Sequence, residues 1–383
     1  MLKNPPFCPN PDCKYHHRSA LSSHSSRSWY RKNGRYKTKN FGRIQRFICK
    51  TCGTQFSSRT FSIDYGIKKK IPCRRIFEQM NAGSGLRSLA RNLGVSEKVI
   101  INRLGRLAHQ AIGIHAVLRP SCPVKENLVT DGFESFVVSQ YFPNNIHLLV
   151  GKNSQYLYGA DYAHIRRKGR MQDKQKQKRS ELEQIFRPPK GDITRSFTRI
   201  IRQLIEYTQS AHQWSLTLFS DEKTEYRNVL KGVLTEQTDI HGRLPVIEHL
   251  TVSSRIARTV KNDLFPVNYY DREIRKDQGN HVRETVQFSR NVNNCMERLW
   301  VYSAYHNYMK PFRIGKIRSK GKSHGMEAGI PFGKIQKELG RFFTRRYFVT
   351  RLSLTVSEWY SWFRCYKTPL KAMAETLPEY MCA

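Results

Sequence analysis

The chain has 383 residues, enough for about two or three domains and at least one sizeable core. Its 67 Lys and Arg against 30 Asp and Glu give a formal net charge of +37, and nucleic acid is the simplest partner for such a surface. No apolar run approaches the ~20 residues of a membrane span, and the first residues lack the apolar core of a signal peptide. We therefore expect no membrane partner and a cytoplasmic, nucleoid-associated protein. In that reducing compartment its nine cysteines do not form a disulfide framework.

Residues 1–65 carry two pairs of cysteines on short, turn-forming segments. Cys8 and Cys13 lie in CPNPDC, and Cys49 and Cys52 lie in CKTCG after the strand-like RIQRFIC. Four thiolates brought together in this way form a tetrahedral site for structural Zn²⁺, so we expect a zinc ribbon. The first pair has an unusually long spacing, which leaves His16 or His17 as an alternative to Cys13.

Between the two cysteine pairs, the run from Arg27 to Arg46 contains eight basic residues and no acid, interleaved with aromatic residues. Basic side chains neutralise phosphates and aromatic rings stack or pack beside them, so the run indicates contact with DNA. A solvated loop is the alternative for any single residue. The candidate DNA-binding residues here are Arg31, Lys32, Arg35 and Lys37.

Residues 66–118 have the pattern of a helix-turn-helix. Leu89, Ala90 and Leu93 give one apolar face, Gly94 ends that helix, and Ser96 is placed to cap a second helix. Placed in a major groove, the second helix would present polar side chains to bases and phosphates. The expected contacts are Ser96, Lys98, Asn102 and Arg103. A plain helical hairpin in a core is the alternative.

Residues 119–313 contain strand-like and helix-like segments in an ordered series. The segments ENLVTDGFESFVV, NNIHLLVG and QYLYGADYAHI predict three antiparallel strands, followed by a basic insertion around residues 165–192. We expect this insertion to be a mobile loop that either contacts DNA through Arg166 and Arg167 or is simply solvated. A helix, the strand WSLTLFSDE, the strand PVIEHLTVSS and a long helix from about Val282 to Met309 follow.

This order of elements, with DGFESF, FSDE and HVRETVQFSRNVNNCMERLWVYSAYHNYMKPF, resembles the DDE transposases of bacterial insertion sequences, over roughly residues 1–315. The resemblance implies a multidomain α+β and α/β chain, in which an RNase H-like mixed sheet flanked by helices follows the ribbon and the helix-turn-helix. It also implies three catalytic acids, Asp131, Asp221 and Glu284, which hold two Mg²⁺ or Mn²⁺ ions for phosphoryl transfer. Glu297 is the alternative third acid, and Glu134 and Glu222 lie close to the first two.

The function that this resemblance implies is DNA transposition: binding of element ends, metal-dependent strand cleavage and transfer of the 3′-OH to target DNA. Double-stranded DNA would be the partner, and pairing of two ends would require a homodimer or a higher assembly. A non-catalytic DNA-binding regulator on a decayed nuclease fold, and more remotely an RNA-binding protein, are the alternatives. Residues 314–383 read as a basic linker and a tail, partly helical with a possible strand at FVTRLSLTV, to which we assign no function.

Overall fold

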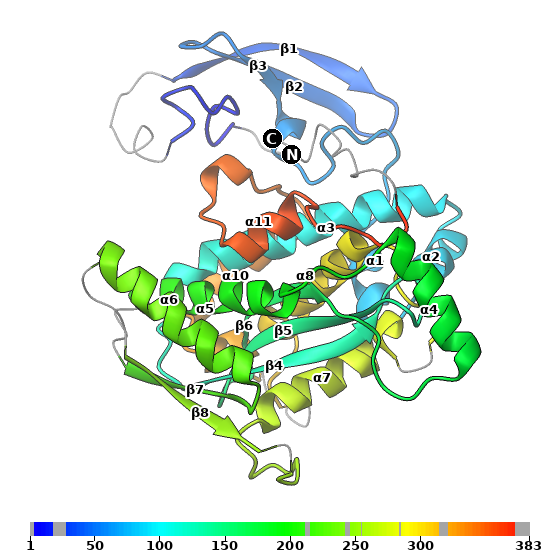
Figure 1. Cartoon of the computed structure of the whole chain (residues 1–383). Coiled ribbons are helices and arrows are strands. Elements are labelled where there is room, and N and C mark those ends of the chain that lie inside the picture. Colours follow the sequence, from blue (N-terminus) through cyan, green and yellow to red (C-terminus); the bar gives the residue numbers. More distant parts are fainter. Residues whose placement is uncertain are drawn as a thin grey trace.

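The computed structural model describes residues 4–17, 28–210, 215–241, 246–253, 255–282, 285–313 and 321–371. They form a small three-stranded sheet near the N-terminus and a larger body built on a five-stranded sheet with helices packed against it (Figure 1). The fold class is therefore mixed α+β, as expected. We call the described residues up to 65 the N-terminal module.

The N-terminal module is an antiparallel sheet in the order β1-β2-β3. Its small core is mostly aromatic and sulfur-containing, with Phe47, Phe56 and Phe61 beside three of the cysteines. Phe348, from the far end of the chain, is buried in the same core. The strands are β1 (Tyr30–Thr38), β2 (Gly42–Cys49) and β3 (Gln55–Ser57).

Three helices follow the N-terminal module. The turn between the second and third contains Gly94 with a φ of +60°, a left-handed conformation that glycine adopts without strain. The third helix is much longer than a recognition helix requires, and its second half packs against α8 (Val292–Tyr308). The three are α1 (Cys73–Asn81), α2 (Leu86–Asn92) and α3 (Glu97–Leu118).

The large sheet has the strand order β6-β5-β4-β7-β8. The first three strands in the sequence pair antiparallel, whereas β7 is parallel to β4 and β8 is parallel to β7. The strands are β4 (Leu128–Phe136), β5 (Pro143–Gly151), β6 (Leu157–His164), β7 (Ser215–Asp221) and β8 (Val246–Val252).

Two hydrophobic clusters cover opposite faces of this sheet. Leu128 and Leu218 pack with α5 and α6, while Val129 and Phe219 pack with α7 and α8. Side chains alternate between faces along a strand, so every second residue of β4 and β7 points toward α7 and α8. The helices are α5 (Asp192–Ser210), α6 (Thr224–His241) and α7 (Phe265–Asp277), together with α8.

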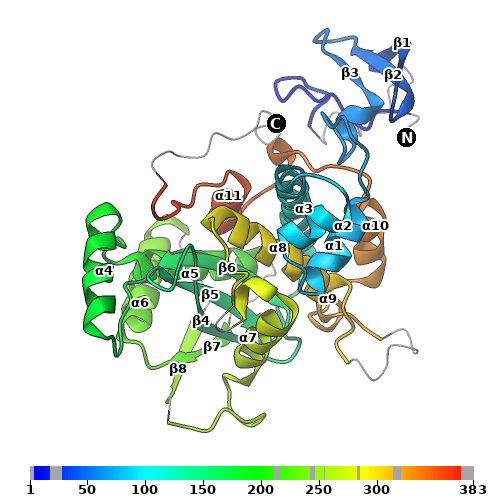
Figure 2. The same cartoon turned by 90° about the vertical axis from the view of Figure 1, so that its right-hand side faces the viewer.

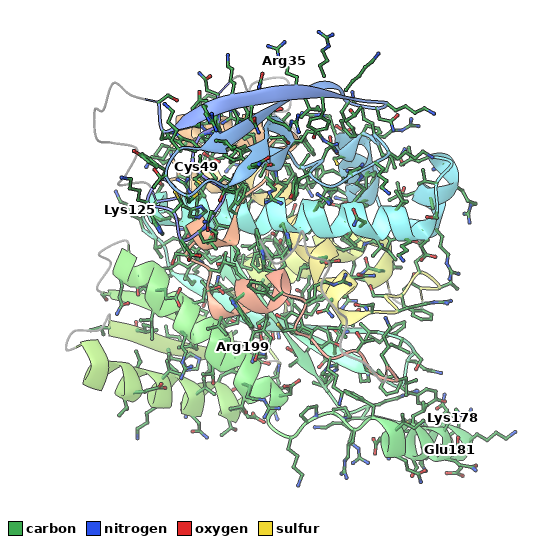
Figure 3. The ribbon with its side chains drawn as sticks, turned by 90° about the horizontal axis from the view of Figure 1, so that it is seen from above. Arg35, Cys49, Lys125, Lys178, Glu181 and Arg199 are labelled. Atoms are coloured by element: carbon green, nitrogen blue, oxygen red, sulfur yellow. The ribbon has the colours of Figure 1, made fainter. Side chains whose placement is uncertain are left out.

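The basic insertion contains a helix, α4 (Asp173–Ile185), so the expectation of a mobile loop there was wrong. Three ion pairs between residues three or four apart stabilise it, including Lys178 Nζ to Glu181 Oε2 at 3.0 Å, and both of these side chains are labelled in Figure 3. No side chain of α4 is buried. The helix therefore projects as a charged element from the body (Figure 2).

The C-terminal segment is integrated into the fold and is not a tail. Phe342 and Trp362 are buried in the main core, and the Trp362 ring stacks on His109 of α3 with centroids 3.9 Å apart. The expected strand at residues 348–356 is absent, because that stretch is a 3-10 turn followed by the start of α11. The helices are α9 (His324–Glu327), α10 (Phe332–Phe342) and α11 (Val356–Trp362). Residues 314–320, within the expected linker, lie outside the described residues.

Candidate functional site

The four N-terminal cysteines converge. Cys8 Sγ lies 3.6 Å from Cys52 Sγ, Cys13 Sγ lies 3.7 Å from Cys49 Sγ, and all four sulfurs are within 4.8 Å of one another. These separations are far longer than the ~2.05 Å of a disulfide. They match the roughly 3.8 Å expected between thiolates around one Zn²⁺ with Zn–S bonds of ~2.3 Å. The cluster can therefore hold a metal ion such as zinc.

The pKa values of the cysteine thiols are consistent with a cation site. Burial raises the pKa of Cys8, whereas hydrogen bonds with Thr54 outweigh burial and lower the pKa of Cys52 to about 6. A thiolate is thus already favoured at one position, and a bound cation would favour it at the others. Burial of three of the four cysteines also shields the site from solvent.

The histidine alternative to Cys13 is not supported by this geometry. His16 is fully buried, but its Nδ1 lies 2.8 Å from the Cys8 carbonyl oxygen and its Nε2 lies 2.9 Å from Thr350 Oγ1. Both ring nitrogens are therefore engaged, and His16 fastens the N-terminal module to the C-terminal segment. His17 is exposed, and the metal-competent group contains only the cysteines.

The basic residues of β1 are on the surface. Arg31, Lys32, Arg35 and Lys37 are all exposed, and Figure 3 shows Arg35 on the outer strand of the module. Arg35 Nε donates to Gln45 Oε1 across the strand pair at 3.0 Å, which orients its guanidinium. The strand therefore presents a row of four exposed positive side chains that are available to phosphates.

The four residues expected on the second helix of the helix-turn-helix have different environments. Ser96 and Lys98 are exposed, and Asn102 is half-buried and accepts a hydrogen bond from Arg106 Nε at 3.2 Å. Arg103 is only 1% exposed, and it bonds Asp64 Oδ1 and the Lys69 carbonyl, each at 2.8 Å. The expectation that Arg103 contacts DNA is therefore corrected, because its guanidinium points into the protein.

The two arginines before α4 also have partners within the protein. Arg166 makes a bidentate pair with Glu183 of α4, at 2.7 and 2.8 Å, but the arginine stays exposed. Arg167 is half-buried and its guanidinium lies 4.9 Å above the ring of Tyr141. These contacts fix the position of α4 relative to the body. Of the two, the structure leaves Arg166 the more accessible to an external phosphate.

The first two candidate acids lie side by side. Strands β4 and β7 are parallel neighbours, with Leu128 opposite Leu218 and Val129 opposite Phe219. Continuing this register by two residues places Asp131 opposite Asp221. Both residues share a face with Val129 and Phe219, the face covered by α7. The alternatives Glu134 and Glu222 are exposed.

The two carboxylates share one cation. Lys223 Nζ lies 3.2 Å from Asp221 Oδ2 and 3.9 Å from Asp131 Oδ1. Burial and the charge of Asp221 nevertheless raise the pKa of Asp131. Asp221 Oδ1 is buried and has no hydrogen-bond partner among the described residues. Two carboxylates side by side on rigid strands have the chemistry of a hard-cation site.

A third acid, which the sequence reasoning missed, faces this pair from α7. Asp271 follows Val267 by four residues and precedes Ile274 by three, and both of those side chains are fully buried against the sheet. Burial and the charge of Asp131 raise the pKa of Asp271 well above its usual range. Its Oδ1 is also buried and has no hydrogen-bond partner within the described ranges. Asp271 is therefore a third carboxylate near Asp131, but the three acids do not lie close enough together to form one metal-binding group in this structure.

The structure describes only one of the two expected third acids. Glu284 lies outside the described residues, and the helix expected to carry it begins only at Val292, with the Asn291 side chain accepting from the Asn294 backbone as its N-cap. Residues just before that cap are extended, and Ser289 forms a bridge with Val137 beyond β4. Glu297 is buried on α8, where Oε1 lies 3.5 Å from Arg364 Nε.

A signal for Asp271 was present in the sequence. The stretch FPVNYYDREIRKD has the helical spacing of Val267, Tyr270 and Ile274, which brings an acid onto the inner face. The sequence reasoning placed the third acid on the long helix expected from about Val282, and it did not identify the shorter helix α7. Among the described residues, only the four cysteines form a group close enough to hold one ion.

No family model and no curated protein matches the chain. Function must therefore be argued from the site alone. No helix among the described residues has the length and apolar character needed to cross a bilayer.

Proposed function

We propose that the chain is a DNA transposase, which binds element ends and catalyses metal-dependent strand cleavage and 3′-OH strand transfer. The observation that carries this proposal is the juxtaposition of Asp131 and Asp221 on adjacent parallel strands, with Asp271 facing them from α7. The strand order, three antiparallel strands and then two parallel ones, supports an RNase H-like domain.

The donor set fits Mg²⁺ or Mn²⁺, because carboxylate oxygens without other partners are the ligands that hard cations prefer. When bound, two such ions would activate the attacking oxygen and stabilise the leaving oxygen. Asp131, Asp221 and Asp271 would hold them. Electrostatics favours this arrangement, since a cation would offset the burial and the repulsion that raise the pKa values of Asp131 and Asp271.

The other residues of the site serve DNA and its phosphates. The positive charges of Lys223 and Arg258 partly offset the rise in the pKa of Asp131. Both side chains are therefore near the reacting position. They would help to hold a scissile phosphate beside the acids. The exposed row on β1, together with Ser96 and Lys98, would bind the flanking duplex. The cysteine cluster would hold structural Zn²⁺, which keeps that row in place.

One experiment tests the proposal. The purified chain is incubated with supercoiled plasmid and Mn²⁺, and nicking is followed for the wild type and for Asp131→Asn, Asp221→Asn and Asp271→Asn. Removing a residue that only hydrogen-bonds to a metal ligand typically lowers metal affinity or activity by about 10–100-fold. Removing a ligand itself is therefore expected to lower the nicking rate by more than about 100-fold. Asp173→Asn, on the exposed α4, is the matched control. Unchanged nicking by all three variants would refute the nuclease proposal.

A second candidate is a non-catalytic DNA-binding regulator on the same fold. The position of Lys223 favours it, because an ammonium group within 4 Å of both aspartates occupies the space that a catalytic cation would need. This candidate predicts that the wild type binds duplex DNA and nicks no plasmid at any concentration of Mg²⁺ or Mn²⁺. The transposase proposal predicts nicking that depends on the metal.

A further inference from the structure

A groove lies where the N-terminal module, the end of α3 and the C-terminal segment meet. It encloses about 640 Å³ and continues into a second hollow of about 270 Å³, with which it shares Val117, Pro120, Arg351 and Leu352. The module stands over α3 and α10 at this junction (Figure 2). We call the two hollows together the basic groove.

The lining of the basic groove is strongly positive. One acid, Glu338, faces six cationic side chains from α10 and the segment after it. Glu338 is already engaged, since Oε1 pairs with Arg341 at 3.2 Å and Oε2 accepts from Tyr347 Oη at 2.7 Å. The six cationic residues are Lys334, Lys337, Arg341, Arg345, Arg346 and Arg351.

Several of these charges lack compensation from the protein. Lys337 and Arg345 are exposed and make no ion pair within the part of the chain that the structure describes. Arg346 is half-buried, and burial lowers its pKa to about 10. Its Nε has no hydrogen-bond partner among the described residues. Holding several cations close together is costly, most of all for the half-buried Arg346, and a bound polyanion reduces that cost.

The groove is preorganised. The guanidinium of Arg346 lies 4.4 Å from the ring centre of Tyr65 and 4.3 Å from that of Phe348, which restricts its plane. The backbone of Arg346 donates to the Phe61 carbonyl at 3.0 Å, and Phe348 is buried in the module's core. These contacts hold Arg346, and the backbone that carries the neighbouring cations, between two parts of the molecule.

We propose that the basic groove binds the phosphodiester backbone of DNA, which gives the C-terminal segment a role in holding the nucleic acid. This inference rests on the proposed function and adds a contact surface separate from the acids and from β1. Phosphates would be held by Lys337, Arg345 and Arg346 through charge-assisted hydrogen bonds to their ammonium and guanidinium groups.

The test measures the affinity of the full chain for a fluorescent 30-base-pair duplex at several salt concentrations between roughly 50 and 300 mM. The slope of log affinity against log salt falls by about 0.9 for each lost phosphate contact. Lys337→Ala/Arg345→Ala is therefore expected to lower the slope by about 1.8. Arg227→Ala/Lys231→Ala removes the same charge from exposed positions on α6, which lines neither hollow, and is the matched control.

Each outcome decides the inference. A smaller slope for the groove variant, with the control unchanged and the melting temperature preserved, supports it. The groove proposal is overturned if the wild type and the groove variant have equal slopes, or if the slope falls equally for the two double variants. DNA binding and the proposed function would still stand in either case. A wild type that binds single-stranded RNA in preference to the duplex overturns both. The nicking assay reports separately on Asp131, so failure of the groove and failure of catalysis are distinguishable.

Discussion

The sequence predicts that Arg103 contacts DNA, whereas the structure gives it a structural role inside the protein. A substitution of Arg103 distinguishes the two roles. Its guanidinium is 1% exposed and holds Asp64 and the Lys69 carbonyl at 2.8 Å each. Arg103→Met keeps much of the side-chain volume and removes the charge and both hydrogen bonds. The variant thus leaves Asp64 beside an apolar side chain.

The expected cost follows from this burial. Breaking a buried ion pair costs about 3–5 kcal/mol, since it strands the remaining charge. The Asp64 side chain is 23% exposed, so water partly solvates it, and we expect about 2–3 kcal/mol. With an unfolding entropy of about 2.1 cal/mol/K per residue, each kcal/mol lowers the melting temperature of a 383-residue chain by about 1.2 °C, which gives a fall of roughly 2–4 °C.

Calorimetry and duplex binding, both at fixed salt, check the prediction. Lys98→Ala, at an exposed position near the start of the same helix, is the control. It should change stability by less than about 0.5 kcal/mol and weaken DNA binding. The reasoning fails if Arg103→Met melts like the wild type while its salt slope drops by about 1, because that pair of results would place Arg103 on a phosphate.

Two further predictions concern the metal site and the acids. Cys49→Ser should abolish binding of one Zn²⁺ per chain, measured by elemental analysis, and should unfold the N-terminal module; Cys365→Ser, at an exposed cysteine, should retain the metal. Asp271→Asn should raise the melting temperature when Mg²⁺ is absent, because the folded pKa of Asp271 is raised and the wild type loses stability as pH climbs from about 3.8 toward that pKa. The gain should be larger at pH 8 than at pH 5, and an equal gain at both would contradict the assigned environment.

The sequence predicted the sheet well because the signal is local. Apolar runs such as those around Leu148 and Leu218 mark buried strands whatever they pair with, and the aspartates that follow such runs, within β4 and at the end of β7, could be found in the same way. The cysteine cluster was predictable for a similar reason, since each pair sits on its own turn. What each segment packs against was harder to predict.

The misses all depend on tertiary contacts. Arg103 looks like a surface residue until Asp64, 39 residues earlier, is placed beside it. Phe348 reads as part of a tail, yet it completes the core of a module that ends near residue 65. The long helix was extended ten residues too far, because nothing in the sequence shows that Ser289 pairs beside Val137 and that Asn291 caps the helix. Local sequence preferences carry no information about contacts with residues so far away in the chain.

Helix α3 connects the two halves of the proposed function. It begins at the surface with Ser96 and Lys98, and it ends in a core that also contains Leu128 of β4, three residues before Asp131. A helix of 22 residues is about 33 Å long. Along this length α3 packs on α8, stacks His109 on Trp362 and bonds Gln110 to the Phe342 carbonyl. Because each contact is buried, the helix behaves as a rigid spacer. Duplex DNA held at its exposed end would thus lie at a fixed distance from the acids, which is what cleavage at a set position from a recognised end requires.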